Sequence, residues 1–524
     1  MRTKAIVSGA IILIVGNILS SLLGLFREML LAAHYGTGMD MDSYLFANTI
    51  PAIILAFMSG IFSSGFIPLY IRKRVEQGGE EATLLYSSTI NWTLLIMLAV
   101  AAAGYALSPQ LASLFASTDA ERAQTAKLLW ILLPTLFFFT LSYAQSAVLN
   151  SVDHFTMPAL LTAFNNVIMI AFIVLFHRSL GIYSVAWGYM LGTVVQFLVQ
   201  LPIMKKKGLR YRIYLSWRDE SLRKLLAMSI PIAGLVVIDQ CSVLALRYFA
   251  ADLAEGSASA LNFANRIVTL PISLFGTAIV SSTFPSIVQL SAENKRAESE
   301  RLIRTTIKGM LLVLVPVAVL CAVFAHDIIR ALLERGAFDR EATRMTSFAF
   351  VLASVGIVLY PVRDFCVKLL ISRHRAAAPI LSSLIYAAVF IAGCALTVPH
   401  LAYRGIAVSG SAALVASFLF LLAQFRRSGR KARIRFPAAF LFKLASSSAV
   451  GALAALVFRR EVALWGRLTF PDTLLTLTAL GIGMCAYAAS AKLWRIEEIN
   501  FVYGKLLAKF RLDKKRGVSA KTGG

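Results

Sequence analysis

The chain has 524 residues, of which 58% are hydrophobic and only 15% are charged, and its mean hydropathy is +0.73. Soluble domains carry about 25% charged residues, so this composition excludes an ordinary soluble protein and predicts a chain that folds in a lipid bilayer. The formal net charge of +25 is dispersed without interleaved stacking aromatics, which argues against a nucleic-acid-binding protein.

Apolar runs of membrane-spanning length recur from one end of the chain to the other. About 20 helical residues are needed to cross a hydrocarbon core about 30 Å thick. The fourteen predicted helices lie at residues 5–33, 44–70, 86–107, 124–149, 157–177, 182–203, 224–250, 261–290, 304–325, 345–371, 379–398, 404–425, 437–458 and 472–491. The predicted fold class is therefore an all-α integral membrane protein.

The cations predict the orientation of these helices. When alternate loops are assigned to opposite sides, about 35 of the 52 Lys and Arg residues fall on the side of the N-terminus. The densest groups are 205–224, 426–435 and the tail 492–524, whereas the opposite loops are poor in cations except for one that holds Arg330, Arg335, Arg340 and Arg344. The positive-inside rule then predicts a multi-pass membrane protein with both termini in the cytoplasm.

The sequence contains an internal repeat. Displacement by 217 residues aligns the second span with the eighth without a gap, and a shift of 220 places Arg27 on Arg247 and Gly36 on Gly256. In the ungapped alignment 46–48 (Phe-Ala-Asn) falls on 263–265 (Phe-Ala-Asn), Ser64 on Ser281 and Pro68 on Pro285. Chance similarity among apolar helices is the alternative, but matched Asn and Pro residues favour duplication.

Six spans separate the repeat starts, so the two halves share one orientation. Parallel repeats of this kind enclose a central cavity that opens alternately to each side. We therefore predict two six-helix lobes related by pseudo-twofold symmetry, at 1–222 and 223–436. Helices 13 and 14, at 437–491, and a basic cytoplasmic tail, at 492–524, follow them.

Several ionisable residues fall inside predicted spans. Burying a charge at the bilayer centre costs at least about 2.5 kcal/mol, so such residues usually face a wet cavity or a partner. Cations outnumber anions, which favours an anionic substrate such as a diphosphate, since guanidinium donates two parallel hydrogen bonds to phosphate oxygens. The candidate binding cations are Arg27, Arg266, Arg247, Arg363 and Lys368. The alternative is snorkelling or structural ion pairing, for example between Arg363 and Asp364.

Two asparagines occupy equivalent positions in the repeat. Asn48 and Asn265 are candidates for hydrogen bonds to a sugar, or alternatively for bonds between helices. No catalytic constellation, nucleotide-binding loop or CxxC metal motif is present, so neither an enzyme nor a cofactor or metal site is predicted.

A set of short motifs resembles the MurJ/MviN family of lipid II flippases. They extend from residue 8 to 425, and the most telling are 23–28 (Leu-Gly-Leu-Phe-Arg-Glu), 42–47 (Asp-Ser-Tyr-Leu-Phe-Ala), 50–51, 60–63, 66–68, 149–151, 166–167, 264–266, 270–271 and 334–338. The resemblance implies the fold of the multidrug, oligosaccharidyl-lipid and polysaccharide exporter superfamily. It also implies a cationic central cavity, and a groove for a lipid tail along helices 13 and 14.

The resemblance also implies a substrate and its binding residues. The substrate is an undecaprenyl-diphosphate-linked peptidoglycan precursor carried across the bacterial cell (inner or plasma) membrane, with membrane lipids and cell-wall synthesis enzymes as further expected partners. Arg27 and Arg266 match cavity arginines of the family, and Asp42 matches its second-span acid. The chain departs from the family pattern by having Ile54 and Leu55 in place of two arginines, Ser59 in place of Glu, and Asn265 in place of Asp.

The sequence therefore predicts a flippase that works by alternating access, with Arg27 and Arg266 on the diphosphate. Membrane potential or a monovalent cation is the expected energy source. The alternatives are a flippase for another lipid-linked oligosaccharide, such as a capsule or exopolysaccharide unit, a cation-coupled drug exporter, and a non-transporting scaffold for envelope enzymes.

Overall fold

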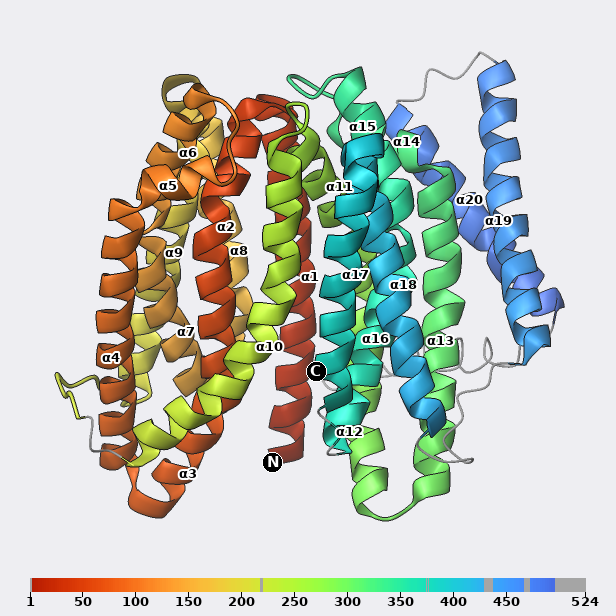
Figure 1. The fold of residues 1–524 in the computed structure, drawn as a ribbon. Helices are drawn as coiled ribbons and strands as arrows, with labels where there is room; N and C mark the ends of the chain where they lie inside the picture. Colours follow the sequence, from red (N-terminus) through yellow and green to blue (C-terminus); the bar gives the residue numbers. More distant parts are fainter. Residues whose placement is uncertain are drawn as a thin grey trace, which may run out of the picture. The chain divides into compact units, whose positions relative to one another are not determined.

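The computed structural model describes residues 2–216, 220–373, 375, 377–427, 437–465 and 472–494, and none of these residues lies in a β-strand. Figure 1 shows the helices in chain order. The first half holds α1 (Arg2–Tyr35), α2 (Met39–Gly60), α3 (Ile67–Gln77), α4 (Gly79–Ala106), α5 (Ser108–Ser113), α6 (Asp119–Leu132), α7 (Thr135–Ser151), α8 (Thr156–Leu180), α9 (Tyr183–Lys206) and α10 (Glu220–Ala251). The second half holds α11 (Ser257–Pro271), α12 (Thr277–Ala292), α13 (Arg296–Val323), α14 (Ala325–Leu333), α15 (Arg340–Ala353), α16 (Val355–Ser372), α17 (Ala377–Leu401), α18 (Tyr403–Arg427), α19 (Ala438–Trp465) and α20 (Asp472–Leu493).

The hydrophobic lengths of these helices match a bilayer. Thirteen helical stretches in the described part of the chain are long and apolar enough to cross a membrane. They coincide with thirteen of the fourteen predicted spans, and the remaining prediction, 224–250, falls within the 32-residue helix α10. The predicted all-α, multi-pass membrane fold is confirmed.

The second and eighth spans share an unusual internal feature. Each is an α-helix interrupted by a π-helical segment, η1 (Ile61–Phe66) between α2 and α3 and η2 (Ile272–Gly276) between α11 and α12. The two spans begin at Met39 and Ser257. These starts are 218 residues apart, one more than the predicted repeat offset of 217. π-helical segments inside α-helices are rare and often occur at functional sites.

The contacts divide the chain into two compact units. The first contains Met1–Arg266, Leu333–Ala349 and Ser383–Ala413, and the second contains Ile267–Leu332, Phe350–Ser382 and Leu414–Gly524. The lobe boundaries predicted at 222 and 436 remain a prediction. The basic run 426–435 and the tail 492–524 fall almost wholly outside the described residues.

Within the first unit, two glycines allow close approach between the end of α1 and the loop before α15. Gly36 and Gly336 have φ values of +60° and +59°, which favour glycine over other residues. A Cβ at Gly336 would lie 2.2 Å from the Ala33 carbonyl oxygen, and one at Gly36 would lie 2.3 Å from that of Ala337. The Ala337 N–H donates to the same Ala33 oxygen at 2.9 Å, so the two backbones are hydrogen-bonded as well as in contact.

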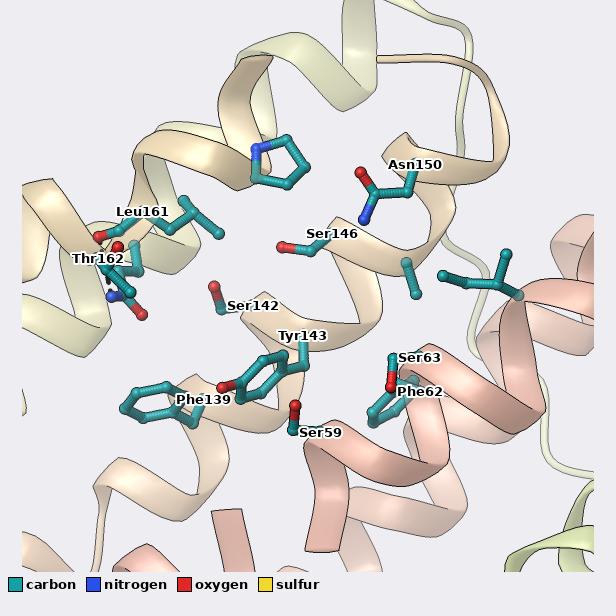
Figure 2. Close-up of a pocket in the computed structure, with 14 residues that line it drawn as sticks. Ser59, Phe62, Ser63, Phe139, Ser142, Tyr143, Ser146, Asn150, Leu161 and Thr162 are labelled. Carbon is teal, nitrogen blue, oxygen red and sulfur yellow. Dashed lines mark hydrogen bonds between the residues drawn. The ribbon is translucent and has the colours of Figure 1, made fainter. Parts of the chain in front are cut away.

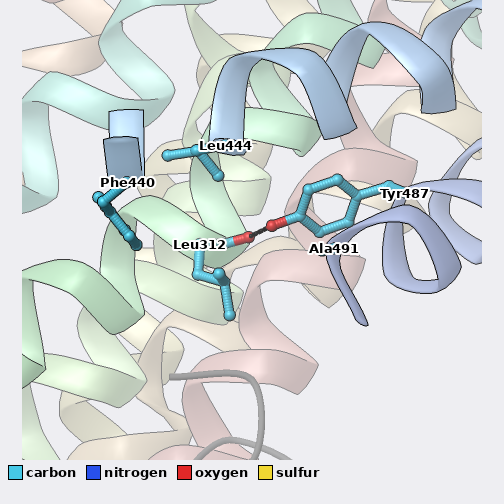
Figure 3. Close-up of a cluster of buried hydrophobic side chains, with 5 residues drawn as sticks. All are labelled: Leu312, Phe440, Leu444, Tyr487 and Ala491. Carbon is cyan, nitrogen blue, oxygen red and sulfur yellow. Dashed lines mark hydrogen bonds between the residues drawn. The ribbon is translucent and has the colours of Figure 1, made fainter. Parts of the chain in front are cut away.

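Within the second unit, α13, α19 and α20 share a hydrophobic core (Figure 3). Leu312, Phe440, Leu444, Tyr487 and Ala491 are buried there. The Tyr487 hydroxyl donates a hydrogen bond of 2.7 Å to the Leu312 carbonyl oxygen, which joins α20 to α13. Small residues permit close packing of α19 on α20, since a Cβ at Gly451 would lie 2.7 Å from the Gly483 oxygen.

The short helix α14 was not predicted, and ion pairs connect it to α19 and α20. Asp327 on α14 pairs with Arg459 on α19, and Arg330 pairs with Asp472 at 2.9 Å. Arg330 is one of the four cations that made its loop an exception to the predicted charge pattern. Its charge is matched by a carboxylate on α20, so this arginine has a structural partner on the predicted outer side.

Candidate functional site

Two adjacent charged residues lie within the membrane-spanning part of α1. Arg27 is only 15% exposed and Glu28 only 6% exposed in their side chains. One Arg27 nitrogen donates to the Glu28 carboxylate at 2.5 Å, and another donates to the Asn166 amide oxygen on α8 at 2.9 Å. Asn166 is itself oriented by a 3.1 Å hydrogen bond from its amide to the Ser20 carbonyl oxygen. The guanidinium of Arg27 is therefore held in one position by two helices.

Glu28 also contacts the second predicted arginine. The Arg266 Nε atom on α11 lies 3.7 Å from the same Glu28 oxygen that accepts from Arg27. Arg266 is 57% exposed, so one of the two guanidinium groups is buried and the other is accessible. We call Arg27, Glu28, Asn166 and Arg266 the arginine cluster. Two cations share one carboxylate, which leaves the cluster with a net positive charge.

Tyrosines form part of the surroundings of this cluster. Tyr44 on α2 and Tyr189 on α9 both lie within electrostatic range of Arg27 and Arg266. The remaining polar atoms are incompletely satisfied, because Arg27 Nε and Glu28 Oε2 are buried and have no hydrogen-bond partner among the described residues. An unmade hydrogen bond of a buried polar group costs about 1–3 kcal/mol, more for charged groups, so the cluster is well disposed to accept a polar ligand.

Arg247 and Asn48 are also left with unpaired buried atoms in the described structure. Arg247 Nε and Nη1 and Asn48 Oδ1 are buried without a hydrogen-bond partner there. Arg247, on α10, interacts electrostatically with Asp42 and Arg266. Asn265 is exposed next to Arg266 on α11. The structure thus places Arg27, Arg247 and Arg266 in the first unit, with Arg266 close to Glu28 beside Arg27 and within electrostatic range of Arg247.

Asp42 is engaged at the start of α11. Its two carboxylate oxygens accept backbone N–H groups of Gly256 and Ser259, at 2.8 and 2.7 Å. These groups are otherwise unpaired at a helix N-terminus, where a carboxylate is stabilising. Residues 42 and 259 are equivalent in the repeat, so this bond joins corresponding positions of the two halves. A substrate-binding role for Asp42 remains a prediction beside this structural one.

Arg363 and Lys368 lie on α16 in the second unit. Lys368 pairs with Asp364 one turn away, at 2.7 Å. Both partners are about half exposed, at 46% and 53%. This carboxylate was considered as a partner for Arg363 from the sequence, and the structure shows it next to Lys368. The binding role of the two cations remains a prediction.

The first unit also contains a cavity of about 220 Å³ between α2, η1, α3, α7, α8 and α9 (Figure 2). Ser142, Ser146 and Asn150 follow one another at four-residue intervals along α7 and face this space. None of the fourteen residues that line it carries a charge. We call it the polar pocket, and no residue of it was among the predicted site residues.

Comparison with known proteins shows the family to which the chain belongs. A family model described as lipid II flippase MurJ matches residues 31–476. This chain belongs to that family. The resemblance drawn from the sequence motifs is confirmed, and the MurJ match extends beyond residue 425, where the motifs ended.

Individual relatives of the MurJ family agree with the family model. The "Probable lipid II flippase MurJ" of Haemophilus influenzae is 28% identical over 484 residues, which cover 87% of this chain and 93% of the relative. The "Lipid II flippase MurJ" of Burkholderia cenocepacia is 28% identical over 353 residues, which cover 65% of this chain and 68% of the relative.

Solved structures share the fold. One titled "Lipid II flippase MurJ, inward closed conformation" has a TM-score of 0.79 at 23% identity and covers 95% of this chain and 100% of its own. An inward-facing multidrug resistance MATE family transporter of the MOP superfamily has a TM-score of 0.68 at 15% identity and covers 78% of this chain and 94% of its own. At such identities the likeness concerns the fold alone, and it agrees with the exporter superfamily that the sequence predicted.

Proposed function

We propose that this protein moves lipid II, an undecaprenyl-diphosphate-linked peptidoglycan precursor, from the cytoplasmic to the outer leaflet by alternating access. The observation that carries the proposal is the arginine cluster. Arg27 is buried and held by Glu28 and Asn166, whereas Arg266 is exposed and only 3.7 Å from the shared carboxylate. A site with one oriented cation and one accessible cation suits a diphosphate, because each guanidinium can donate two parallel hydrogen bonds to phosphate oxygens.

Glu28 stabilises this site when no substrate is bound. A buried cation without a counter-charge is costly in a membrane, so the carboxylate stabilises Arg27 in the empty protein. An arriving diphosphate competes with Glu28 for Arg266, the weaker of the two contacts. Binding then exchanges one anionic partner for another, and the Arg27–Glu28 pair stays in place.

Arg247 supplies a further donor for the same anion. Two of its nitrogens are buried without a partner in the described structure, and it interacts electrostatically with Arg266. The family's paired second-span arginines are replaced here by Ile54 and Leu55. In our proposal Arg247 takes over part of their contribution to the diphosphate site. The prenyl tail stays in lipid along α19 and α20.

The proposal extends to the cellular setting. Membership of a lipid II flippase family supports a location in the bacterial inner (plasma) membrane, and the charge distribution supports cytoplasmic termini. Cell-wall synthesis enzymes are candidate partners at the basic cytoplasmic loops, and the membrane potential or a monovalent cation is the proposed energy source.

Depletion of the protein in its native cell tests the proposed function. We expect lipid II accessible to an externally added, membrane-impermeant probe to fall while lipid II inside the cell accumulates. Complementation by the unaltered chain should restore accessibility, and complementation by Arg27→Ala/Arg266→Ala should not, although the variant reaches the membrane. Restoration by that double variant would contradict the assignment to the arginine cluster.

A second candidate substrate is favoured by the residues that differ from the family. Ile54, Leu55, Ser59 and Asn265 replace charged family residues, which suits a different lipid-linked oligosaccharide carried on the same diphosphate. Depletion would then leave surface lipid II unchanged and remove another surface glycan.

A further inference from the structure

The polar pocket contains the kinds of groups that bind neutral sugars. Serine hydroxyls and amides from four helical segments face it, and each is a donor and an acceptor at once. Phe139 and Tyr143 provide an aromatic wall, with ring centroids 5.5 Å apart in a stacked arrangement (Figure 2). A neutral, amphipathic ring with hydroxyl groups at its edges and C–H groups on its faces matches both parts of this lining.

The polar groups of the pocket are positioned by a buried network. The Gln200 amide donates to the Ser142 hydroxyl at 2.8 Å and accepts from the Ser146 hydroxyl at 3.0 Å. The Gln196 amide, which lines the pocket, donates to the Leu161 carbonyl oxygen at 2.9 Å. Asn150 is different, since its amide makes no hydrogen bond with the rest of the described chain. The pocket therefore combines fixed hydroxyl groups with an amide that is available to a ligand.

The pocket lies one helical turn from the arginine cluster. Thr162 lines the pocket, and its hydroxyl donates to the Ser20 hydroxyl on α1 at 2.8 Å. Asn166, four residues further along α8, contacts the Ser20 carbonyl oxygen and holds Arg27. Four helical residues rise about 6 Å, and residues i and i+4 share one helix face.

An aromatic path provides a second connection. Tyr143 lies within hydrogen-bonding reach of Ser59 in the pocket, and Phe139 contacts Tyr189 with ring centroids 6.0 Å apart. Tyr189 in turn lies within electrostatic range of Arg27. The pocket and the cluster are thus joined by side-chain contacts within the first unit.

We propose that the polar pocket binds the uncharged ring of the first sugar of the glycan while the arginine cluster holds the diphosphate. The inference rests on the proposed function and adds to it a second subsite with its own residues. In a glycosyl diphosphate the sugar is bonded directly to the phosphate, which fits two subsites about one helical turn apart. A space of about 220 Å³ is smaller than pockets for drug-sized ligands, so it suits one sugar ring rather than a whole oligosaccharide.

Binding of two lipids by the full chain in nanodiscs tests this inference. One is undecaprenyl diphosphate without a sugar, and the other carries one neutral sugar. We expect the unaltered chain to bind the sugar-bearing lipid roughly tenfold more tightly, as two or three neutral hydrogen bonds would provide. Asn150→Leu and Ser63→Leu fill the pocket from α7 and η1, and each should bring the ratio of the two affinities close to one.

Controls separate a sugar subsite from general damage. Ser151→Leu places the same side chain next to Asn150 but outside the pocket lining, and it should keep the preference. Asn150→Ala removes the available amide without adding bulk, and retained binding of the sugar-free lipid shows that each variant is folded. Arg27→Ala should weaken binding of both lipids equally.

The outcomes distinguish this inference from the proposed function. Equal binding of both lipids by the unaltered chain, or an undiminished preference in the pocket variants, would overturn the sugar subsite and leave the diphosphate site intact. Failure of the unaltered chain to bind either lipid would overturn the proposed function and the subsite together.

Discussion

Glu28 carries one negative charge between the guanidinium groups of Arg27 and Arg266. In Glu28→Gln the shape is kept, but the buried Arg27 loses its counter-charge. Removing one partner of a buried ion pair costs about 3–5 kcal/mol, so we expect a lower thermal unfolding temperature in detergent or nanodiscs. Arg27→Gln/Glu28→Gln should regain most of that stability, since no buried charge is left alone, yet should not transport. A single variant as stable as the unaltered chain would show that Glu28 does not neutralise Arg27.

At Asp42, a substitution can distinguish a structural role of the carboxylate from a role in substrate binding. Asp42→Asn keeps one acceptor for the N-terminus of α11 and loses the charge, so we expect a loss of about 0.5–2 kcal/mol in stability. Substrate affinity measured well below the unfolding temperature should be unchanged. Asp40→Asn is a matched control, because that carboxylate accepts from the Gln124 side chain at 2.6 Å and does not cap α11. A selective loss of substrate affinity in Asp42→Asn would favour the binding role.

At the scale of helices, the hydropathy of the sequence predicted nearly all of the membrane-spanning segments. Each predicted span became a helix or a pair of helices, because a long apolar run must satisfy its backbone hydrogen bonds internally in lipid. The helices α5 and α14 were missed because they are 6 and 9 residues long, too short for a span. The π-helical segment η1 was also missed, because no periodic pattern in the sequence indicates that a helical turn contains one extra residue.

The candidate site was harder to predict from the sequence than the helices were, for a different reason. Arg27 and Arg266 were recognised because a charge in an apolar run is conspicuous. The roles of Glu28 and Asn166 depend on contacts between helices far apart in the chain, which one sequence does not display. Ser142, Ser146 and Asn150 are ordinary in any helix, and only their shared face toward a cavity distinguishes them. Their four-residue spacing along α7 was the one available signal.

The ion pairs of α14 predict how the α19–α20 hairpin is held. Asp327 is buried with 7% of its side chain exposed, so Asp327→Arg should release α19 and increase hydrogen exchange in its last turns. Asp327→Arg/Arg459→Asp restores the opposite charges and should restore protection. Exchange that stays low in the single variant would show that apolar packing alone holds α19.

Gly336 gives a backbone test at the end of α1. Gly336→Ala places a Cβ against the Ala33 oxygen at a positive φ, so we expect destabilisation of more than about 1 kcal/mol. Gly208→Ala is the matched control, because Gly208 has a similar φ of +68° but no atom within 4 Å of its Cβ position. Equal unfolding temperatures for the two variants would contradict the close contact.

At the scale of the whole molecule, the charge of the substrate predicts a response to voltage. An anion that leaves the cytoplasm moves toward the positive side of an inside-negative membrane, and each charge gains about 2.3 kcal/mol per 100 mV. We expect flipping in proteoliposomes to accelerate with a potassium diffusion potential of that sign and to slow when the sign is reversed. If the flipping rate does not change with the potential but changes with a sodium or proton gradient, that ion is the coupling ion.

The π-helical segments bear on the history of the chain. A π turn contains one residue more than an α turn, so its insertion shifts every later residue of the helix by one position. The repeat keeps the single offset of 217 on both sides of these segments, at Phe46 and Phe263 before them and at Pro68 and Pro285 after them. Had only one half acquired the extra residue, the alignment would need a gap. The two halves therefore have equal lengths across this span, and the interruption lies at a different place in each, since a shift of 217 carries η1 onto 278–283 whereas η2 begins at Ile272.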